Sequence, residues 1–130
     1  MEPYKKSGYW FDGAEYDLQT AKAMLETRRY LYVGFMCHQT IEKALKGIFV
    51  TKCPNEELPY IHKLVRLANL CGIIDEMSEE QLALLDVLNP LNVDARYPVN
   101  KELLLKSLSQ ERCEKLIKET EALLEWLKTK

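Results

Sequence analysis

The sequence has no apolar run that approaches the ~20 consecutive residues needed by a membrane-spanning helix. Its first residues, Met1 to Ser7, are polar and contain no hydrophobic segment typical of a signal peptide. Basic residues are not in excess, since 18 lysines and arginines stand against 20 aspartates and glutamates. A general nucleic-acid-binding surface of positive charge is therefore not expected, although a local basic patch is compatible with this balance. These absences predict a cytoplasmic protein with no membrane segment.

Glycine is scarce, and the sequence contains no low-complexity segment, no glycine-rich phosphate loop, no HExxH zinc motif and no CxxC pair. The four cysteines are scattered, which favours small, buried, reduced thiols: Cys37, Cys53, Cys71 and Cys113. Cys53, His62 and Cys71 could form a metal site on paper, but their spacing fits no zinc template. The sequence therefore predicts neither a metal nor a cofactor.

Apolar residues recur at helical spacing through most of the chain, which predicts an all-α fold. We expect a single domain over residues 1–130, built as an up-and-down bundle of four to five helices. Three long helices are expected, from about Trp10 to Thr27, from Tyr30 to Lys52, and from a start between Lys101 and Ser109 to about Leu127.

Two shorter helices are expected between the long ones, at His62–Leu70 and at Glu79–Leu88, with Leu82, Leu85 and Leu88 of the second pointing inward. The second begins with a capping box, in which Ser78 is the N-cap residue and Gln81 occupies the third helical position. Pro90 and Pro98 exclude a regular helix between Asn89 and Asn100.

The apolar face of the second long helix is interrupted by polar side chains. Around an ideal helix, His38 and Glu42 fall on the stripe that is otherwise formed by Leu31, Phe35, Leu45 and Phe49. A buried imidazole or carboxylate is costly unless it is paired. This helix therefore either holds a buried polar network or faces a ligand cleft, and Asp17 on the first helix is a possible partner.

Two further groups carry candidate binding residues. Gln39, Lys43 and Lys46 occupy a strip beside the His38 stripe, and they form either a solvated face or a contact surface for phosphate or for an acidic partner. Arg96 and Tyr97 lie in a proline-flanked loop, where a guanidinium can bind phosphate and a phenol ring can stack on a base. The alternative for this loop is a structural bridge from Arg96 to Asp94 or Asp17. His62, at the start of a helix, is more typical of a structural histidine than of a catalytic one.

Taken together, these residues resemble the HEPN domain family, the higher-eukaryote and prokaryote nucleotide-binding family. The resemblance covers nearly the whole chain in order, and its most specific part is the string Gln-x-x-Glu-Lys-Ala-Leu-Lys at residues 39–46. The other matching positions are Trp10, Ala14, Asp17, Leu18, Ala21, Tyr32, Phe35, Met36, Cys37, His38, His62, Leu64, Leu67 and Ala95-Arg96-Tyr97-Pro98.

The resemblance implies a helical bundle that usually forms a homodimer and accompanies a minimal nucleotidyltransferase, with toxins, antitoxins and some RNases among its members. In the RNase branch, an arginine is followed after four to six residues by a histidine, and no arginine of this chain is followed in that way. The resemblance therefore implies the branch without the RNase motif. Apolar residues spread around the second helix also favour a dimer: Phe35, Met36, Phe49 and Val50.

The expected function is a non-catalytic nucleotide- or RNA-binding module that is paired with a nucleotidyltransferase in a toxin–antitoxin-like system. Its candidate ligand-binding residues are His38, Gln39, Glu42, Lys43, Lys46, Arg96 and Tyr97. In this hypothesis Arg96 and Lys46 bind phosphate, and Tyr97 stacks or forms a hydrogen bond. Glu42 and Asp17 hold Arg96 or His38 in place.

Two alternatives to this function stay open. The first is an RNase with a non-standard site that uses His38 or His62 together with Arg96. The second is a purely structural interaction domain.

Overall fold

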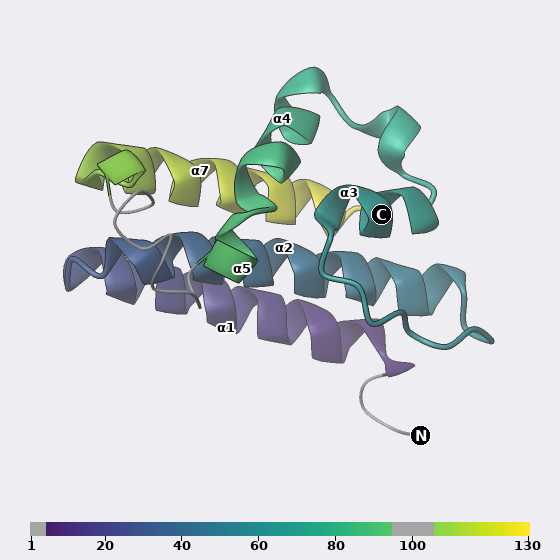
Figure 1. The fold of residues 1–130 in the computed structure, drawn as a ribbon. Helices are drawn as coiled ribbons and strands as arrows, with labels where there is room; N and C mark the ends of the chain where they lie inside the picture. The colour runs from purple at the N-terminus through teal and green to yellow at the C-terminus, as the bar shows by residue number, and fades with distance from the viewer. Residues whose placement is uncertain (1–4, 95–105) are drawn as a thin grey trace.

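The computed structural model describes residues 5–94 and 106–130, and all the regular structure in these ranges is helical (Figure 1). The elements are α1 (Ser7–Glu26), α2 (Tyr30–Lys52), α3 (Leu64–Leu70), the short 3₁₀ helix η2 (Ile74–Glu76), α4 (Glu79–Leu88), α5 (Leu91–Asp94) and α7 (Gln110–Leu127). The all-α bundle expected from the apolar periodicity is confirmed. No helix in the described ranges is long and apolar enough to cross a membrane.

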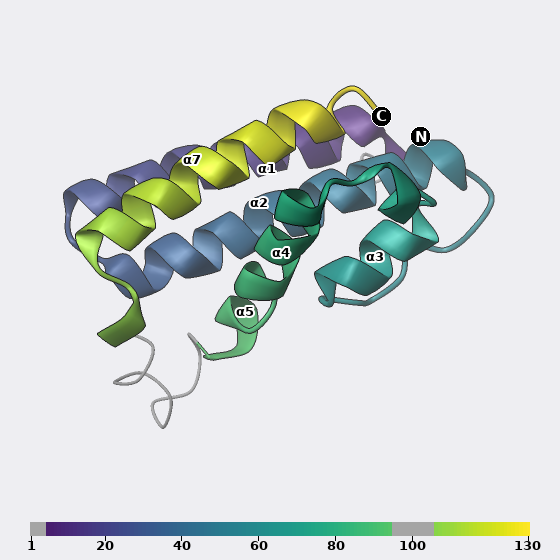
Figure 2. The same cartoon turned by 90° about the horizontal axis from the view of Figure 1, so that it is seen from above.

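Helix α2 is the centre of the bundle. Figures 1 and 2 show α1 and α7 running along one side of it, while α3, α4 and α5 cover the other side. Of its 23 residues, 14 are buried, so this helix is covered on most of its circumference. Of the four apolar residues that favoured a dimer, Phe49 is buried within the chain, whereas Phe35, Met36 and Val50 are half-buried.

Two glycines of α2 allow neighbouring elements to approach closely. A Cβ atom at Gly47 would lie 2.9 Å from the Phe11 ring and 3.2 Å from the Trp10 Cβ, so α1 packs directly on the α2 backbone there. A Cβ atom at Gly34 would lie 2.9 Å from a methyl group of Leu91 at the start of α5. Glycine at position 47 thus brings the first turn of α1 onto the C-terminal half of α2.

Several predicted boundaries agree with the structure. The bounds of α2 and α4 are as expected, and the capping box of Ser78 and Gln81 is present with both of its hydrogen bonds. Ser109 caps α7, which begins at the following residue, Gln110. Of the inward positions predicted for α4, Leu85 and Leu88 are buried.

Other boundaries differ for physical reasons. Helix α1 begins at Ser7, one turn before Trp10. Helix α3 begins at Leu64 rather than His62. The Leu64 N–H donates to the side-chain oxygen of Asn89 at 3.0 Å, so the cap comes from a residue 25 positions away in the sequence. The short helix α5 follows Pro90 directly, in a segment where we expected no regular helix, because proline is accepted immediately before or within a first helical turn.

On α4, Leu82 is half-buried and packs against the core, and Leu84 is buried as well. The inward face of this helix is therefore wider than expected.

Candidate functional site

A buried carboxylate organises the polar residues of α2. The Glu42 side chain is 6% exposed and accepts hydrogen bonds from two basic groups, Lys46 Nζ at 3.0 Å from Oε2 and His62 Nδ1 at 3.0 Å from Oε1. His38 Nδ1 lies 3.7 Å from the same Oε1 atom. We call these four residues the Glu42 cluster. Burying an ionised carboxylate costs free energy unless hydrogen-bond donors and positive charges compensate it, as Lys46 and His62 do here.

His38 is the fully buried member of the Glu42 cluster. Its Nε2 lies 3.0 Å from the His62 carbonyl oxygen, and because a carbonyl can only accept, Nε2 carries the proton. Nδ1 is then unprotonated in the neutral ring and has no hydrogen-bond partner. Burial lowers the pKa of His38 to about 4, against the opposing influence of the Glu42 charge. His38 is therefore a neutral group that holds the backbone of His62 over α2.

His62 comes from the α2–α3 loop (residues 53–63), which returns along α2 so that this imidazole meets Glu42 (Figure 1). Its side chain remains 51% exposed. Since Nδ1 donates to the carboxylate, the other ring nitrogen is the one left for an external group. Our set of candidate ligand residues omitted His62. Nothing in the local sequence indicates that the segment 20 residues after Glu42 folds back onto it.

Lys46 connects the Glu42 cluster to a pocket. Its ammonium lies 5.7 Å from the centre of the Trp10 ring, an arrangement that favours a cation–π contact. The residue is 8% exposed, so of the two alternatives for this strip, the solvated face does not hold at Lys46. A helical projection places Lys46 correctly on α2 but cannot show that α1 and the α2–α3 loop cover it.

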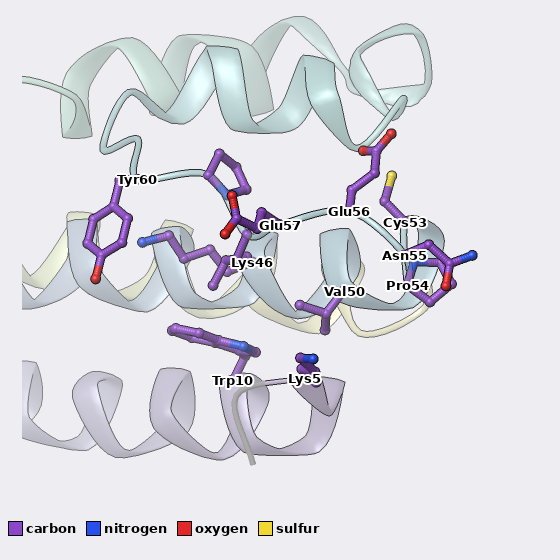
Figure 3. Close-up of a pocket in the computed structure, with 12 residues that line it drawn as sticks. Lys5, Trp10, Lys46, Val50, Cys53, Pro54, Asn55, Glu56, Glu57 and Tyr60 are labelled. Carbon is purple, nitrogen blue, oxygen red and sulfur yellow. The ribbon is translucent and has the colours of Figure 1, made fainter. Parts of the chain in front are cut away.

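The pocket has a volume of about 740 Å³ and lies between the start of α1, the C-terminal half of α2 and the α2–α3 loop (Figure 3). In Figure 3 the Lys46 side chain extends toward Tyr60, and Trp10 lies on the α1 side of the pocket. The Tyr60 side chain is 99% exposed. The full lining is Lys5, Trp10, Lys46, Val50, Cys53, Pro54, Asn55, Glu56, Glu57, Leu58, Pro59 and Tyr60.

The remaining predicted residues in the described ranges do not line the pocket. Asp17 binds Lys43, with 2.8 Å between carboxylate and ammonium. The possible partnership of Asp17 with His38 or Glu42 is therefore not formed. Gln39 is half-buried on α2. Arg96 and Tyr97 lie outside the described residues.

Three of the four cysteines are buried, as predicted, and burial raises the pKa of Cys37 and Cys71 to about 12 and that of Cys113 to about 11. Cys53 is half-buried in the pocket wall. Within residues 5–94 and 106–130, no group of three His, Cys, Asp or Glu side chains is arranged to hold a metal ion. The metal site considered from the sequence, with Cys53, His62 and Cys71 as ligands, is therefore not formed.

Comparison with known proteins gives one family and one similar structure. The sequence model of the HEPN domain family matches residues 7–130. The crystal structure of TT1696 from Thermus thermophilus is similar to this chain with a TM-score of 0.80 and 18% sequence identity, over 95% of this chain and 96% of that one. At this identity the likeness shows the fold. A comparison with curated proteins gives no match.

Proposed function

The chain belongs to the HEPN domain family, and on this premise we propose that it is a non-catalytic module that binds a nucleotide in the pocket of Trp10, Lys46 and Tyr60. One observation carries the proposal, namely the nearly buried ammonium of Lys46, which lies over the Trp10 ring and faces this pocket. An ammonium has three donors, of which Glu42 takes one.

The chemistry of the lining suits a nucleotide better than a simple anion. The volume of about 740 Å³ lies within the range of small-molecule sites, roughly 300–1,000 Å³. Trp10 and Tyr60 supply aromatic surface for a base, and Lys5 and Lys46 supply positive charge for phosphate. Glu56 and Glu57 can accept hydrogen bonds from ribose hydroxyls or a base amino group, which a bare phosphate lacks.

The test is a calorimetric titration of the full chain with ATP, ADP, AMP and short RNA. Tyr60→Ala removes an exposed ring and leaves the core intact, so it should weaken nucleotide binding about tenfold through the lost stack. Lys115→Ala, on an exposed position of α7, is the matched surface control and should leave affinity unchanged. An absence of binding by any nucleotide at millimolar concentration contradicts the proposal. If only RNA binds, the ligand of the module is RNA and not a nucleotide.

The proposal includes a homodimer that works with a separate minimal nucleotidyltransferase in a toxin–antitoxin-like pair. Membership of the family supports this part. Light scattering at high micromolar concentration tests the dimer, and a clean monomer contradicts it. Copurification with the product of the neighbouring gene tests the pairing.

RNA cleavage is the rival function, and one observation favours it. The His62 imidazole is held by a carboxylate through Nδ1 and leaves its other nitrogen accessible, as a general base requires. Purified protein is incubated with structured RNA and tRNA beside the His62→Ala variant. Cleavage that is lost in the variant contradicts the binding-module proposal.

A further inference from the structure

Positive and negative side chains balance each other in the lining of the pocket. Lys5 and Lys46 supply its ammonium groups, and Glu56 and Glu57 supply its carboxylates. A further carboxylate, that of Glu42, is bound to Lys46, with 3.0 Å between Oε2 and Nζ. As far as the structure describes it, the wall of this pocket is therefore not a surface of net positive charge.

The two carboxylates of the pocket differ in their surroundings. Desolvation and, after it, the Glu56 charge raise the pKa of the Cys53 thiol, so Glu56 lies beside Cys53. Figure 3 shows the Glu57 carboxylate pointing to the other side, where Lys46 and Tyr60 lie. Glu57 is exposed and, in the part of the chain that the structure describes, forms no ion pair. Its negative charge therefore has no local counter-charge at this end of the pocket.

The ammonium groups of the pocket suit one phosphate. Lys46 has three donors, of which Glu42 takes one. Its two other donors and the Lys5 ammonium can form charge-assisted hydrogen bonds with the oxygens of a single phosphate. The sequence has no glycine-rich loop of the kind that binds a polyphosphate through backbone N–H groups. The described lining thus contains no separate group for a second or a third phosphate.

The size of the pocket does not limit the number of phosphates. Its volume of about 740 Å³ lies in the upper part of the range for small-molecule sites, roughly 300–1,000 Å³. AMP carries about two negative charges near neutral pH, and each further phosphate adds about one. Because the wall has no net positive charge, each added charge is repelled more than it is attracted. Charge rather than volume is therefore expected to set the class of ligand.

We propose that the pocket selects nucleoside monophosphates over nucleoside diphosphates and triphosphates, and that the Glu57 carboxylate sets this selection. This inference rests on the proposed nucleotide function and extends it by a ligand class and a specificity-determining residue. Lys5 and Lys46 bind the single phosphate, and Glu57 repels every further one from the same end of the pocket. The selection is electrostatic, so it weakens as salt screens the charges.

Glu57→Gln tests the role of the charge without a change in the size of the side chain. Glu57 is exposed in a loop, so the fold should be retained, and thermal unfolding checks this. Glu111→Gln is the matched control, because it removes the same charge from an exposed position at the start of α7, at the opposite end of the bundle (Figure 1). The quantity compared is the ratio of the ATP and AMP dissociation constants. Both ligands contain adenosine, so altered contacts with the base or the ribose cancel in this ratio.

The experiment is calorimetry of the full chain with AMP, ADP and ATP at low salt and about pH 7.5, where the second phosphate ionisation, with a pKa of about 6, is complete. EDTA is present, because divalent metal ions would neutralise part of the polyphosphate charge. We expect the wild-type chain to bind AMP about tenfold more tightly than ATP, with ADP between them, and Glu57→Gln to reduce this ratio to about threefold. Glu111→Gln should keep the wild-type ratio. Added salt should narrow the ratio in the wild-type chain.

The outcomes separate this inference from the proposed function. If the wild-type chain binds ATP as tightly as AMP or more tightly, the selection is wrong while the nucleotide site stands. If the ratio is unchanged in Glu57→Gln, or changes equally in Glu111→Gln, the Glu57 carboxylate does not set the selection and the inference is wrong. If none of the three nucleotides binds at millimolar concentration, the inference and the proposed function are both wrong.

Discussion

Glu42 and Lys46 lie one turn apart on α2 and form a buried ion pair, with 3.0 Å between Oε2 and Nζ. The same ammonium lies 5.7 Å from the centre of the Trp10 ring, and the same carboxylate holds His62. This pair therefore joins three segments, α1, α2 and the α2–α3 loop. A change at either residue affects both the stability of the bundle and the shape of the pocket.

Removing one charge of the Glu42–Lys46 pair should be more destabilising than removing both. Glu42→Gln leaves the Lys46 ammonium largely buried without its counter-charge, and breaking a buried pair on one side destabilises by about 3 kcal/mol. The double variant Glu42→Gln/Lys46→Met removes both charges and should recover part of that loss. Urea unfolding of both single variants and the double variant measures the coupling, and strictly additive effects would show that the pair contributes nothing.

The sequence alone predicts the bundle well because α7 has a clear apolar stripe and α4 has a complete capping box. Helical spacing also places Glu42 and His38 on an apolar stripe, which left a buried polar network and a ligand cleft as alternatives, and in the structure both residues are buried. Spacing along one helix cannot tell what covers that helix. The partnership of Glu42 with His62, the burial of Lys46 and the pairing of Asp17 with Lys43 all depend on how other segments fold back.

Acid should destabilise the protein through His38. Its pKa falls from 6.5 to about 4 on folding because of burial, so between these values the unfolded chain binds a proton that the folded chain does not. The contribution is fully present above pH 6.5 and is lost as the pH falls toward 4, by about 3 kcal/mol at most.

The variant His38→Gln tests this dependence on pH. Gln keeps an amide donor for the His62 carbonyl and does not titrate. Urea midpoints between pH 4 and 7 should fall with pH in the wild-type chain and should lose most of that slope in the variant. Equal slopes would assign the acid sensitivity to other groups.

Gly47→Ala should destabilise the bundle and alter the pocket. A methyl group at this position would lie 2.9 Å from the Phe11 ring and 3.2 Å from the Trp10 Cβ, so α1 has to move away. Such overpacking costs about 1–3 kcal/mol. Gly8→Ala on α1 is the matched control, because nothing lies within 4 Å of its Cβ position.

The control should be neutral or stabilising by up to about 1 kcal/mol, since alanine is the better helix former. Thermal unfolding compares the two variants, and the nucleotide titration is repeated for each. Equal stability of both variants would mean that α1 does not pack on Gly47.

Cys53 should be the one rapidly reacting thiol of Cys37, Cys53, Cys71 and Cys113, and bound nucleotide should protect it. The other three are buried, and burial raises their pKa values to between about 11 and about 12, so that little thiolate forms at neutral pH. Cys53 is half-buried and lines the pocket, although desolvation raises its pKa as well. Mass spectrometry after timed alkylation identifies the modified residue.

Cys53→Ser is the control that should abolish the fast phase. A nucleotide in the pocket covers the sulfur, so saturating AMP should slow alkylation severalfold in the wild-type chain. It should have much less effect in Tyr60→Ala, where the ring that lines the same pocket is missing. Protection that persists undiminished in Tyr60→Ala would place the nucleotide away from Tyr60. Fast alkylation of Cys37, Cys71 or Cys113 would show that the core opens on the timescale of the reaction.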